Sequence, residues 1–242
     1  MFCFHGYGED ATSFSILEPY LGKDLKLIAI DLPFHGKTQW REGLFTPTQL
    51  KDILLLIGGN TNQFSLTGFS LGGRIVLQLL QLMPLKIKSV VLLAPDGLHK
   101  NFWYRFSTQT KIGNNVFKYS MKHPSMLFHF MQWSKKMRLL NTTFYKVAHY
   151  YLDEEISRVL LYKRWTCLQT FTPDLAEIKK IIASYNIPVH LVFGKHDKVI
   201  LSETGKKFIH GIETFAVIYI LEAGHQLLKE KYASAIAQFF YK

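Results

Sequence analysis

The 242-residue sequence predicts an α/β fold in which helices cover both faces of a mostly parallel sheet. The first supporting observation is alternation, because short apolar runs rich in Val, Ile and Leu are separated by segments with helical spacing of apolar residues. The second is that these runs are continuously apolar, as expected of strands buried on both faces. The third is a hydrophobic content of 48%, which is sufficient for a sizeable core.

The first part of the chain supplies strands and helices in regular alternation. We expect strands over residues 1–5, 25–30, 63–69 and 87–93. We expect helices over residues 14–20, 47–57 and 71–83. Pro19 is a break point in the first of these helices, and Thr46 or Thr48 is available to cap the second.

The alternation stops between residues 98 and 172, where the sequence is aromatic, basic and helix-like. We therefore predict that residues 1–97 and 173–242 form the α/β core, and that 98–172 is an inserted helical lid over the sheet. Alternation resumes afterwards. The expected order is a helix over 174–185, a strand over 188–193, a helix over 202–209 capped by Ser202, a strand over 214–221 and a helix over 226–241.

The net charge of +11 is concentrated in the predicted lid. Residues 98–172 carry twelve Lys or Arg against three Asp or Glu, so this segment alone has a charge of +9. Charge localised in this way concerns partners rather than fold. It predicts a solvated helical face, or attraction of an anionic substrate or an acidic partner protein. Nucleic acid is not expected as a partner, because no recognised binding motif accompanies the charge.

The remaining bulk features concern location. No run of about 18 uncharged apolar residues is present, so no membrane span is predicted. The first residues lack the basic region and the length of a signal peptide. The two cysteines, Cys3 and Cys167, lie far apart and are expected to be buried thiols rather than a disulfide or a metal site. Together these observations predict a cytoplasmic protein.

The strongest chemical signal is Gly68-Phe69-Ser70-Leu71-Gly72, which stands between a predicted strand and a predicted helix. Flanking glycines allow a tight turn that exposes the serine hydroxyl near the first N–H groups of the helix. A serine hydroxyl is a poor nucleophile unless a base takes its proton and a carboxylate orients that base. Asp197 and His225 also follow directly after predicted strands. All three side chains are therefore expected at the edge where the carboxyl ends of parallel strands meet.

Five pieces of the sequence, in register, resemble the α/β-hydrolase superfamily over nearly the whole chain. They are His5-Gly6-Tyr7-Gly8, Asp31-Leu32-Pro33-Phe34-His35-Gly36, Gly68-Phe69-Ser70-Leu71-Gly72-Gly73, Phe193-Gly194-Lys195-His196-Asp197 and Gly224-His225. The resemblance implies Ser70 as nucleophile, His225 as general base and then acid, and Asp197 as the group that orients His225. It also implies an oxyanion hole formed by the backbone N–H groups of Tyr7 and Leu71, and it implies no metal or organic cofactor.

Several neighbouring residues have other interpretations. Asp96 also follows a strand and is the alternative to Asp197 as the triad acid. His5 and His35 lie in glycine-bearing turns and are expected to be structural hydrogen-bonding groups. His196 is expected to face solvent, and Glu222 to support the loop of His225.

The sequence departs from the family pattern at its start. The family usually has two strands before the one that leads into the His-Gly turn, whereas here that strand begins at Met1. We expect either a misplaced gene start or a sheet without these N-terminal edge strands. None of the matched motifs lies in the missing part.

The first functional hypothesis is a serine hydrolase that cleaves a carboxylic ester or thioester of a small-to-medium, apolar or anionic substrate. The second keeps the triad and changes the reaction. The turn is similar to that of the MenH-like lyases of the menaquinone pathway, which eliminate pyruvate and bind substrate carboxylate with an Arg at the position of Arg74. The third is a carrier-protein methyl ester esterase, whose acidic carrier protein would dock on the basic lid. A non-catalytic ligand receptor on the same fold is a further class.

Overall fold

A computed structural model describes residues 1–41, 43–99, 101–137 and 152–241 of the chain. The chain divides into two compact units. The core unit comprises residues 1–41, 45–99 and 170–242, and the helical unit comprises residues 42–44 and 100–169. The residue range of the helical unit is close to that of the predicted insertion, 98–172. Its role as a lid stays a prediction.

The core unit is built on a six-stranded sheet with the order β2-β1-β3-β4-β5-β6, and every neighbouring pair is parallel. The predicted parallel α/β sheet is therefore confirmed. The strands are β1 (Phe2–Phe4), β2 (Ile28–Ile30), β3 (Phe64–Phe69), β4 (Ile87–Leu93), β5 (Val189–Gly194) and β6 (Ala216–Leu221). The carboxyl ends of these strands share one edge of the sheet, since Phe4 is in register with Gly68, and Gly68 with Leu92.

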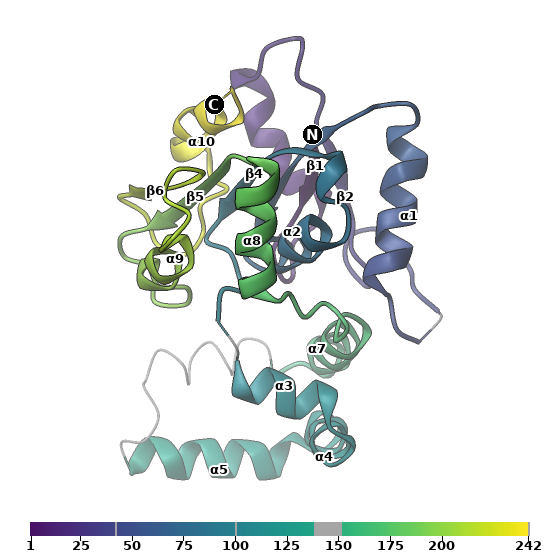
Figure 1. Cartoon of the computed structure of the whole chain (residues 1–242). Coiled ribbons are helices and arrows are strands. Elements are labelled where there is room, and N and C mark those ends of the chain that lie inside the picture. The colour runs from purple at the N-terminus through teal and green to yellow at the C-terminus, as the bar shows by residue number, and fades with distance from the viewer. Residues whose placement is uncertain (42, 100, 138–151, 242) are drawn as a thin grey trace. The chain divides into compact units, whose positions relative to one another are not determined.

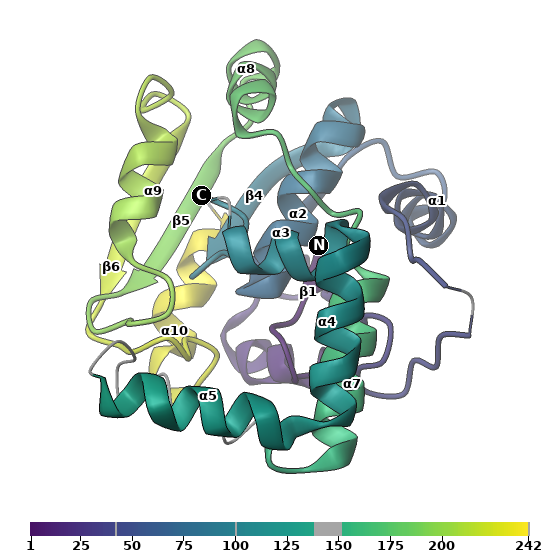
Figure 2. The ribbon, with the colours of Figure 1, turned by 90° about the horizontal axis from the view of Figure 1, so that it is seen from below.

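Helices cover both faces of this sheet (Figures 1 and 2). On one face lies a row of four helices that contact their neighbours in turn: α1 (Pro47–Gly58), α2 (Leu71–Leu82), α8 (Leu175–Tyr185) and α9 (Ser202–Ile209). On the other face α10 (Glu230–Ala237) packs against the 3-10 helix η1 (Ala11–Tyr20). Two short 3-10 helices, η2 (Pro84–Lys86) and η3 (Gln238–Tyr241), complete the unit.

The core sits on both sides of the sheet because the strands are apolar on both faces. All six residues of β5 are buried, and so are four consecutive residues at the end of β4. One cluster joins Phe14 and Leu17 of η1 to Ile236 of α10. The helix α2 is buried from Gly72 to Leu80, so this helix is held firmly where its first residue follows Ser70.

The structure differs from the sequence prediction at several element ends, and the first helix is a 3-10 helix over Ala11–Tyr20 that continues through Pro19 instead of breaking there. Ser202 is the first residue of α9 rather than its cap, because Leu201 takes the extended capping conformation and Ser202 Oγ donates to Glu203 instead. The last helix begins at Glu230, since Leu227 and Leu228 turn into the core and prolong the preceding loop. The second strand is limited to residues 28–30, the three that pair with β1.

The helical unit contains α3 (Phe102–Gln109), α4 (Lys111–Lys122), α5 (Pro124–Lys136) and α7 (Glu155–Cys167). Its interior is partly polar. The Tyr104 hydroxyl donates to the Leu168 carbonyl at 3.3 Å, and the Tyr162 hydroxyl to Asn114 Oδ1 at 2.8 Å. Arg158 is buried and donates to three backbone carbonyls. These bonds tie α7 to α3 and α4.

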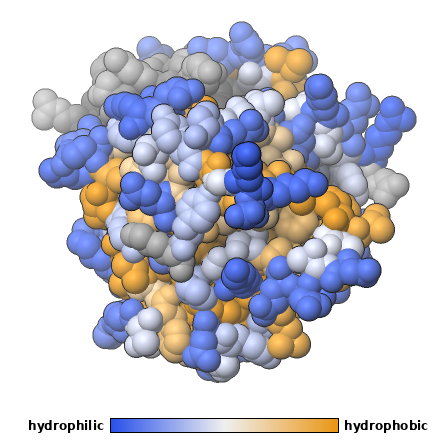
Figure 3. Space-filling model, turned by 90° about the horizontal axis from the view of Figure 1, so that it is seen from above, coloured by the Kyte–Doolittle hydropathy of each residue, from blue (hydrophilic) through white to orange (hydrophobic). Residues whose placement is uncertain are grey.

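Figure 3 shows a face on which hydrophilic side chains surround small, separate hydrophobic patches. Across the described ranges, no helix combines the length and the apolar character that a bilayer crossing requires. Cys3 and Cys167 are buried thiols, as predicted, and burial raises the pKa of Cys3 to about 12.

Candidate active site

Ser70 occupies a strained turn between β3 and α2. Its backbone has φ +50° and ψ −111°, outside the conformations that a non-glycine residue ordinarily adopts. Three backbone hydrogen bonds hold this geometry: the Ser70 N–H donates to Leu93, and its carbonyl accepts from Gly73 and Asp96 at 2.9 and 2.8 Å. The side chain is thereby fixed beyond the end of β3.

Two glycines of this turn stand where the neighbouring backbone leaves no room for a side chain. A Cβ atom at Gly72 would lie 1.9 Å from the carbonyl oxygen of Phe4, and one at Gly68 would lie 2.3 Å from the carbonyl oxygen of Gly72. Both contacts are with backbone, which cannot move aside as a side chain can. The close approach of β1, β3 and α2 therefore depends on glycine at both positions.

His225 joins Ser70 to Asp197. Its Nε2 lies 3.0 Å from Ser70 Oγ, and its Nδ1 lies 2.8 Å from Asp197 Oδ2. Asp197 can only accept at this distance, so the Nδ1 proton points to the carboxylate and Nε2 is the acceptor for the serine hydroxyl. The three predicted triad residues are thus brought into one hydrogen-bonded row.

Asp197 is held on both carboxylate oxygens. Its Oδ1 accepts from the N–H groups of Val199 and Ile200 at 2.7 and 3.0 Å, while Oδ2 faces His225. The Asp197 side chain is 0% exposed and that of His225 is 25% exposed. Burial would raise the pKa of Asp197, but the hydrogen bonds and the attraction of the imidazole outweigh it, so this pKa lies below its ordinary value. The carboxyl group therefore stays ionised beside His225 at neutral pH.

The N–H groups predicted to form the oxyanion hole lie on two segments next to this row. Leu71 is the first residue of α2, so its N–H is one of those that have no partner within the helix. Tyr7 follows Gly6 in the turn after β1. That turn is fixed by His5, whose Nδ1 donates to the Gly6 carbonyl at 2.8 Å and whose Nε2 accepts from the Leu32 N–H at 3.1 Å.

Comparison with known proteins places this arrangement in a family. The sequence model of the family described as "alpha/beta hydrolase fold" matches residues 1–232 of the chain. The chain belongs to the α/β-hydrolase family. It is therefore an α/β-hydrolase, and the resemblance predicted from five sequence pieces is confirmed.

Individual relatives are distant. A serine hydrolase-like protein of Danio rerio is 29% identical over 164 residues. These residues are 66% of this chain and 49% of that protein, so the chain matches about half the length of this relative. Monoacylglycerol lipase abhd6-B of Xenopus laevis is 24% identical over 242 residues, 94% of this chain and 70% of that protein. A thermophilic esterase from Thermogutta terrifontis superposes with a TM-score of 0.68 at 16% identity, covering 99% of this chain and 88% of the esterase. The last likeness shows the fold.

Arg74 and Asp96 of the hydrolase form a pair of their own. Arg74 is buried on α2, and its guanidinium donates a hydrogen bond to the Asp96 carboxylate. Asp96 also accepts from the Gly97 N–H at 2.6 Å, and its own N–H donates to the Ser70 carbonyl. Asp197, and not Asp96, is therefore the carboxylate that contacts His225. Substrate binding by Arg74 stays a prediction.

His5, His35 and His196 lie as the sequence indicated. His5 and His35 are buried, and His35 Nδ1 contacts the Pro33 carbonyl at 2.9 Å. Burial lowers the pKa of His5 more than its Gly6 bond and nearby carboxylates raise it. His196 is exposed and lies 3.0 Å from Glu222. In the ranges that the structure describes, no three His, Cys, Asp or Glu side chains converge as metal ligands.

Sequence reasoning missed one link of the site. Glu9 accepts from the Gly6 N–H at 3.2 Å with one oxygen and from Gln226 Nε2 at 2.5 Å with the other. It therefore joins the turn that carries Tyr7 to the loop that carries His225. The only available signal was position, since Glu9 follows the His-Gly turn and Gln226 is adjacent to His225.

Proposed function

We propose that this hydrolase cleaves a carboxylic ester or thioester through an acyl-enzyme formed on Ser70. The observation that carries the proposal is the row Ser70–His225–Asp197, with contacts of 3.0 and 2.8 Å and a buried, ionised carboxylate at its end. A positioned imidazole is what a serine hydroxyl needs to become a nucleophile at neutral pH.

In the first half of the reaction, Ser70 Oγ attacks the carbonyl carbon of the ester while its proton passes to His225 Nε2. The imidazolium that forms is stabilised by the Asp197 carboxylate, which keeps its negative charge. The tetrahedral intermediate then collapses, and the bond from the carbonyl carbon to the leaving oxygen or sulfur breaks. His225 gives its proton to that leaving atom, so an alcohol or thiol departs and the acyl group stays on Ser70.

In the second half, water replaces the leaving group. His225 takes a proton from the water as its oxygen attacks the acyl carbonyl, and later returns that proton to Ser70 Oγ. The products are a carboxylic acid and the restored serine. The same imidazole therefore serves as base and then acid in each half.

The negative oxygen of both intermediates needs donors, and we assign this role to the N–H groups of Leu71 and Tyr7. The Leu71 N–H belongs to the free amino-terminal end of α2, where negative charge is favoured. Each such preorganised donor is typically worth about 10²- to 10³-fold in rate. Glu9 supports the Tyr7 turn through Gly6 and acts as a positioning residue.

For the substrate we propose a small-to-medium acyl ester. Two relatives are named serine hydrolase-like protein and monoacylglycerol lipase, which agrees with an ester as substrate. The lyase hypothesis requires Arg74 for a substrate carboxylate, whereas Arg74 is engaged by Asp96. The carrier-protein hypothesis and a cytoplasmic location stay predictions.

An active-site-directed probe tests the proposal. A fluorophosphonate should label the wild-type chain and a Ser202→Ala variant, whose substitution lies on the surface helix α9. Ser70→Ala should lose the label and about 10⁴-fold or more of the turnover of a short p-nitrophenyl ester. Labelling of a folded Ser70→Ala variant would show that another residue is the nucleophile.

A further inference from the structure

The helix α4 of the helical unit has three differently built sides. Its inner side carries Gly113, Phe117 and Met121, which are buried or half-buried. A second side carries Ile112, Val116 and Tyr119, which are 74%, 54% and 55% exposed. Spacings of four and three residues place these side chains one above another, so they form a continuous apolar row in solvent. We call this the α4 apolar row.

A row of lysines runs beside it. Lys111, Lys118 and Lys122 are exposed, and their spacings of seven and four residues also place them along one side of α4. At about 100° per residue this side falls between the α4 apolar row and the buried side. The helix therefore presents an apolar strip with positive charge along its border.

The orientation of α4 is fixed by its packing. A Cβ atom at Gly113 would lie 2.0 Å from the Phe106 carbonyl oxygen, so α3 approaches α4 more closely than any other residue would allow. On the same side, Asn114 accepts from Tyr162 and the Met121 carbonyl accepts from Arg158. These contacts with α3 and α7 leave the α4 apolar row directed away from the interior of the helical unit.

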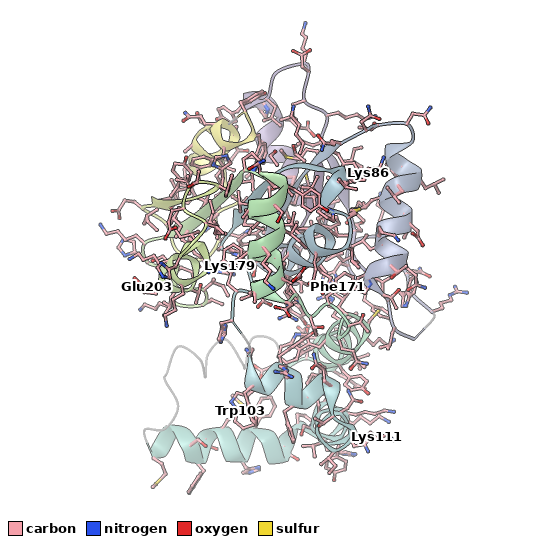
Figure 4. All side chains as sticks on the ribbon, viewed as in Figure 1. Lys86, Trp103, Lys111, Phe171, Lys179 and Glu203 are labelled. Atoms are coloured by element: carbon pink, nitrogen blue, oxygen red, sulfur yellow. The ribbon has the colours of Figure 1, made fainter. Side chains whose placement is uncertain are left out.

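The neighbouring helices add to the same character. On α3, Phe102 and Trp103 are 68% and 71% exposed, and on α7 Ile156 is 67% exposed. Trp103 and Lys111 are labelled on α3 and α4 in Figure 4. The segment from Phe102 to Lys122, which forms α3 and α4, contains four Lys or Arg and no Asp or Glu. Such a surface combines aromatic and aliphatic side chains with charge of one sign.

We propose that the α4 apolar row and its lysines bind the surface of an anionic bilayer. Apolar and aromatic side chains enter the boundary between headgroups and acyl chains, while lysines reach the phosphates, as in interfacial amphipathic helices. A second copy of this chain fits less well, because its own row of lysines would be repelled. An acidic protein would satisfy the lysines and gives no reason for the exposed Ile112 and Val116.

The proposal goes beyond the proposed esterase activity and does not depend on it. A hydrolase held at a bilayer would meet esters that are poorly soluble in water. The binding itself requires only the helical unit's surface, so it is expected to be the same in Ser70→Ala.

Co-sedimentation with lipid vesicles tests the proposal on the full chain. We expect binding to vesicles of phosphatidylcholine with phosphatidylglycerol, little binding to phosphatidylcholine alone, and release by high salt. Replacing Lys111, Lys118 and Lys122 together by Gln should weaken binding on the order of a hundredfold. Replacing Ile112, Val116 and Tyr119 together by Ser should weaken it roughly tenfold or more.

A matched control comes from the core unit. Ile53, Leu56 and Ile57 of α1 are also exposed, at 38%, 83% and 47%, but without a bordering row of lysines. Their replacement by Ser should leave vesicle binding unchanged, and all variants should keep far-UV circular dichroism and turnover of a water-soluble ester. Absence of binding to the anionic vesicles would overturn the proposal. So would a lysine variant that loses binding while the apolar variant binds as wild type, because such a surface recognises charge alone, as an acidic protein does.

Discussion

Each unit of the hydrolase buries one arginine of similar exposure, Arg74 at 7% in the core unit and Arg158 at 8% in the helical unit. Their partners are of different kinds. Arg74 donates to the carboxylate of Asp96, whereas Arg158 donates to the backbone carbonyls of Met121, Leu152 and Asp153 at 3.0, 2.7 and 2.9 Å. One positive charge is neutralised by an opposite charge, and the other is solvated by peptide dipoles.

The core unit has acidic residues at the ends of its strands, and it uses two of them beside positive or proton-accepting groups: Asp96 beside Arg74, and Asp197 beside His225. In the helical unit, Asp153, Glu154 and Glu155 stand close to Arg158 in the sequence, yet Arg158 donates to backbone carbonyls at the end of α4 and before α7. A carbonyl solvates a cation without removing its charge. Arg158 therefore keeps its positive charge.

The largest expected effect tests the carboxylate partners of the core unit. Asp197→Asn removes the charge that stabilises a protonated His225 and offers an amide that can turn its N–H towards Nδ1. We expect kcat for a short ester to fall by about 10⁴-fold, with the fold retained. Steady-state kinetics measures this, and Asp96→Asn is the control. Equal losses in both variants would show that Asp197 has no special role.

The next effect concerns the Arg74–Asp96 pair. Arg74→Met leaves the Asp96 carboxylate without its partner in a partly buried place. We expect the free energy of unfolding to fall by about 3 kcal/mol, the lower end for a broken buried pair because the Asp96 side chain is 25% exposed. Urea unfolding measures this. The double variant Arg74→Met/Asp96→Asn should recover part of the loss, and simple additivity of the two single variants would contradict a direct pair.

A smaller effect is expected at Arg158. Arg158→Met removes the donors from three carbonyls, but these groups can regain water if the helical unit loosens. We expect a loss of about 2 kcal/mol that is confined to the helical unit. Limited proteolysis should therefore cleave within residues 100–169 sooner than in wild type. Turnover of a water-soluble ester should persist, and faster cleavage in the core unit instead would break the distinction between the units.

The smallest effect is a dependence of stability on pH. Because the pKa of Asp197 is lower in the folded chain than in the unfolded one, its contribution to stability is complete above its ordinary pKa of about 3.8. The contribution disappears as the pH falls through the lowered, native pKa. The unfolding free energies of wild type and Asp197→Asn should therefore converge on acidification. A difference that stays constant from pH 7 to the acid limit would contradict a lowered pKa.

Much of the core unit could be predicted from sequence, because its central strands are largely buried. Burial makes β3 to β5 mostly apolar, and each ends at a turn whose composition is visible, so Ser70 and Asp197 could be placed at one edge. The element ends were less predictable. Residues 226–229 have apolar spacing that suits a helix, but Gln226 is held by Glu9 and Leu227 enters the core.

The polar contacts could not be predicted in the same way. Arg74 and Asp96 were each considered alone, as a substrate ligand and as a triad acid, since nothing in a sequence shows that the two side chains face each other. The partners of Arg158 are backbone carbonyls. Because every residue has a carbonyl, the sequence does not show which ones Arg158 contacts. The exposure of Ile112, Val116 and Tyr119 on α4 could not be predicted either. A helix with one buried and one exposed apolar side has the same sequence pattern as a helix with two buried sides.

Ser70 and His225 are separated by 155 residues of sequence, and all of the helical unit except residues 42–44 is encoded between them. During synthesis the turn at Ser70 can form with β1, β3 and α2 long before β6 exists. The imidazole arrives only when β6 has paired with β5 and the following loop has folded back. A nascent chain thus holds Ser70 without the base that the proposed ester cleavage requires. The site is complete only when the fold is finished.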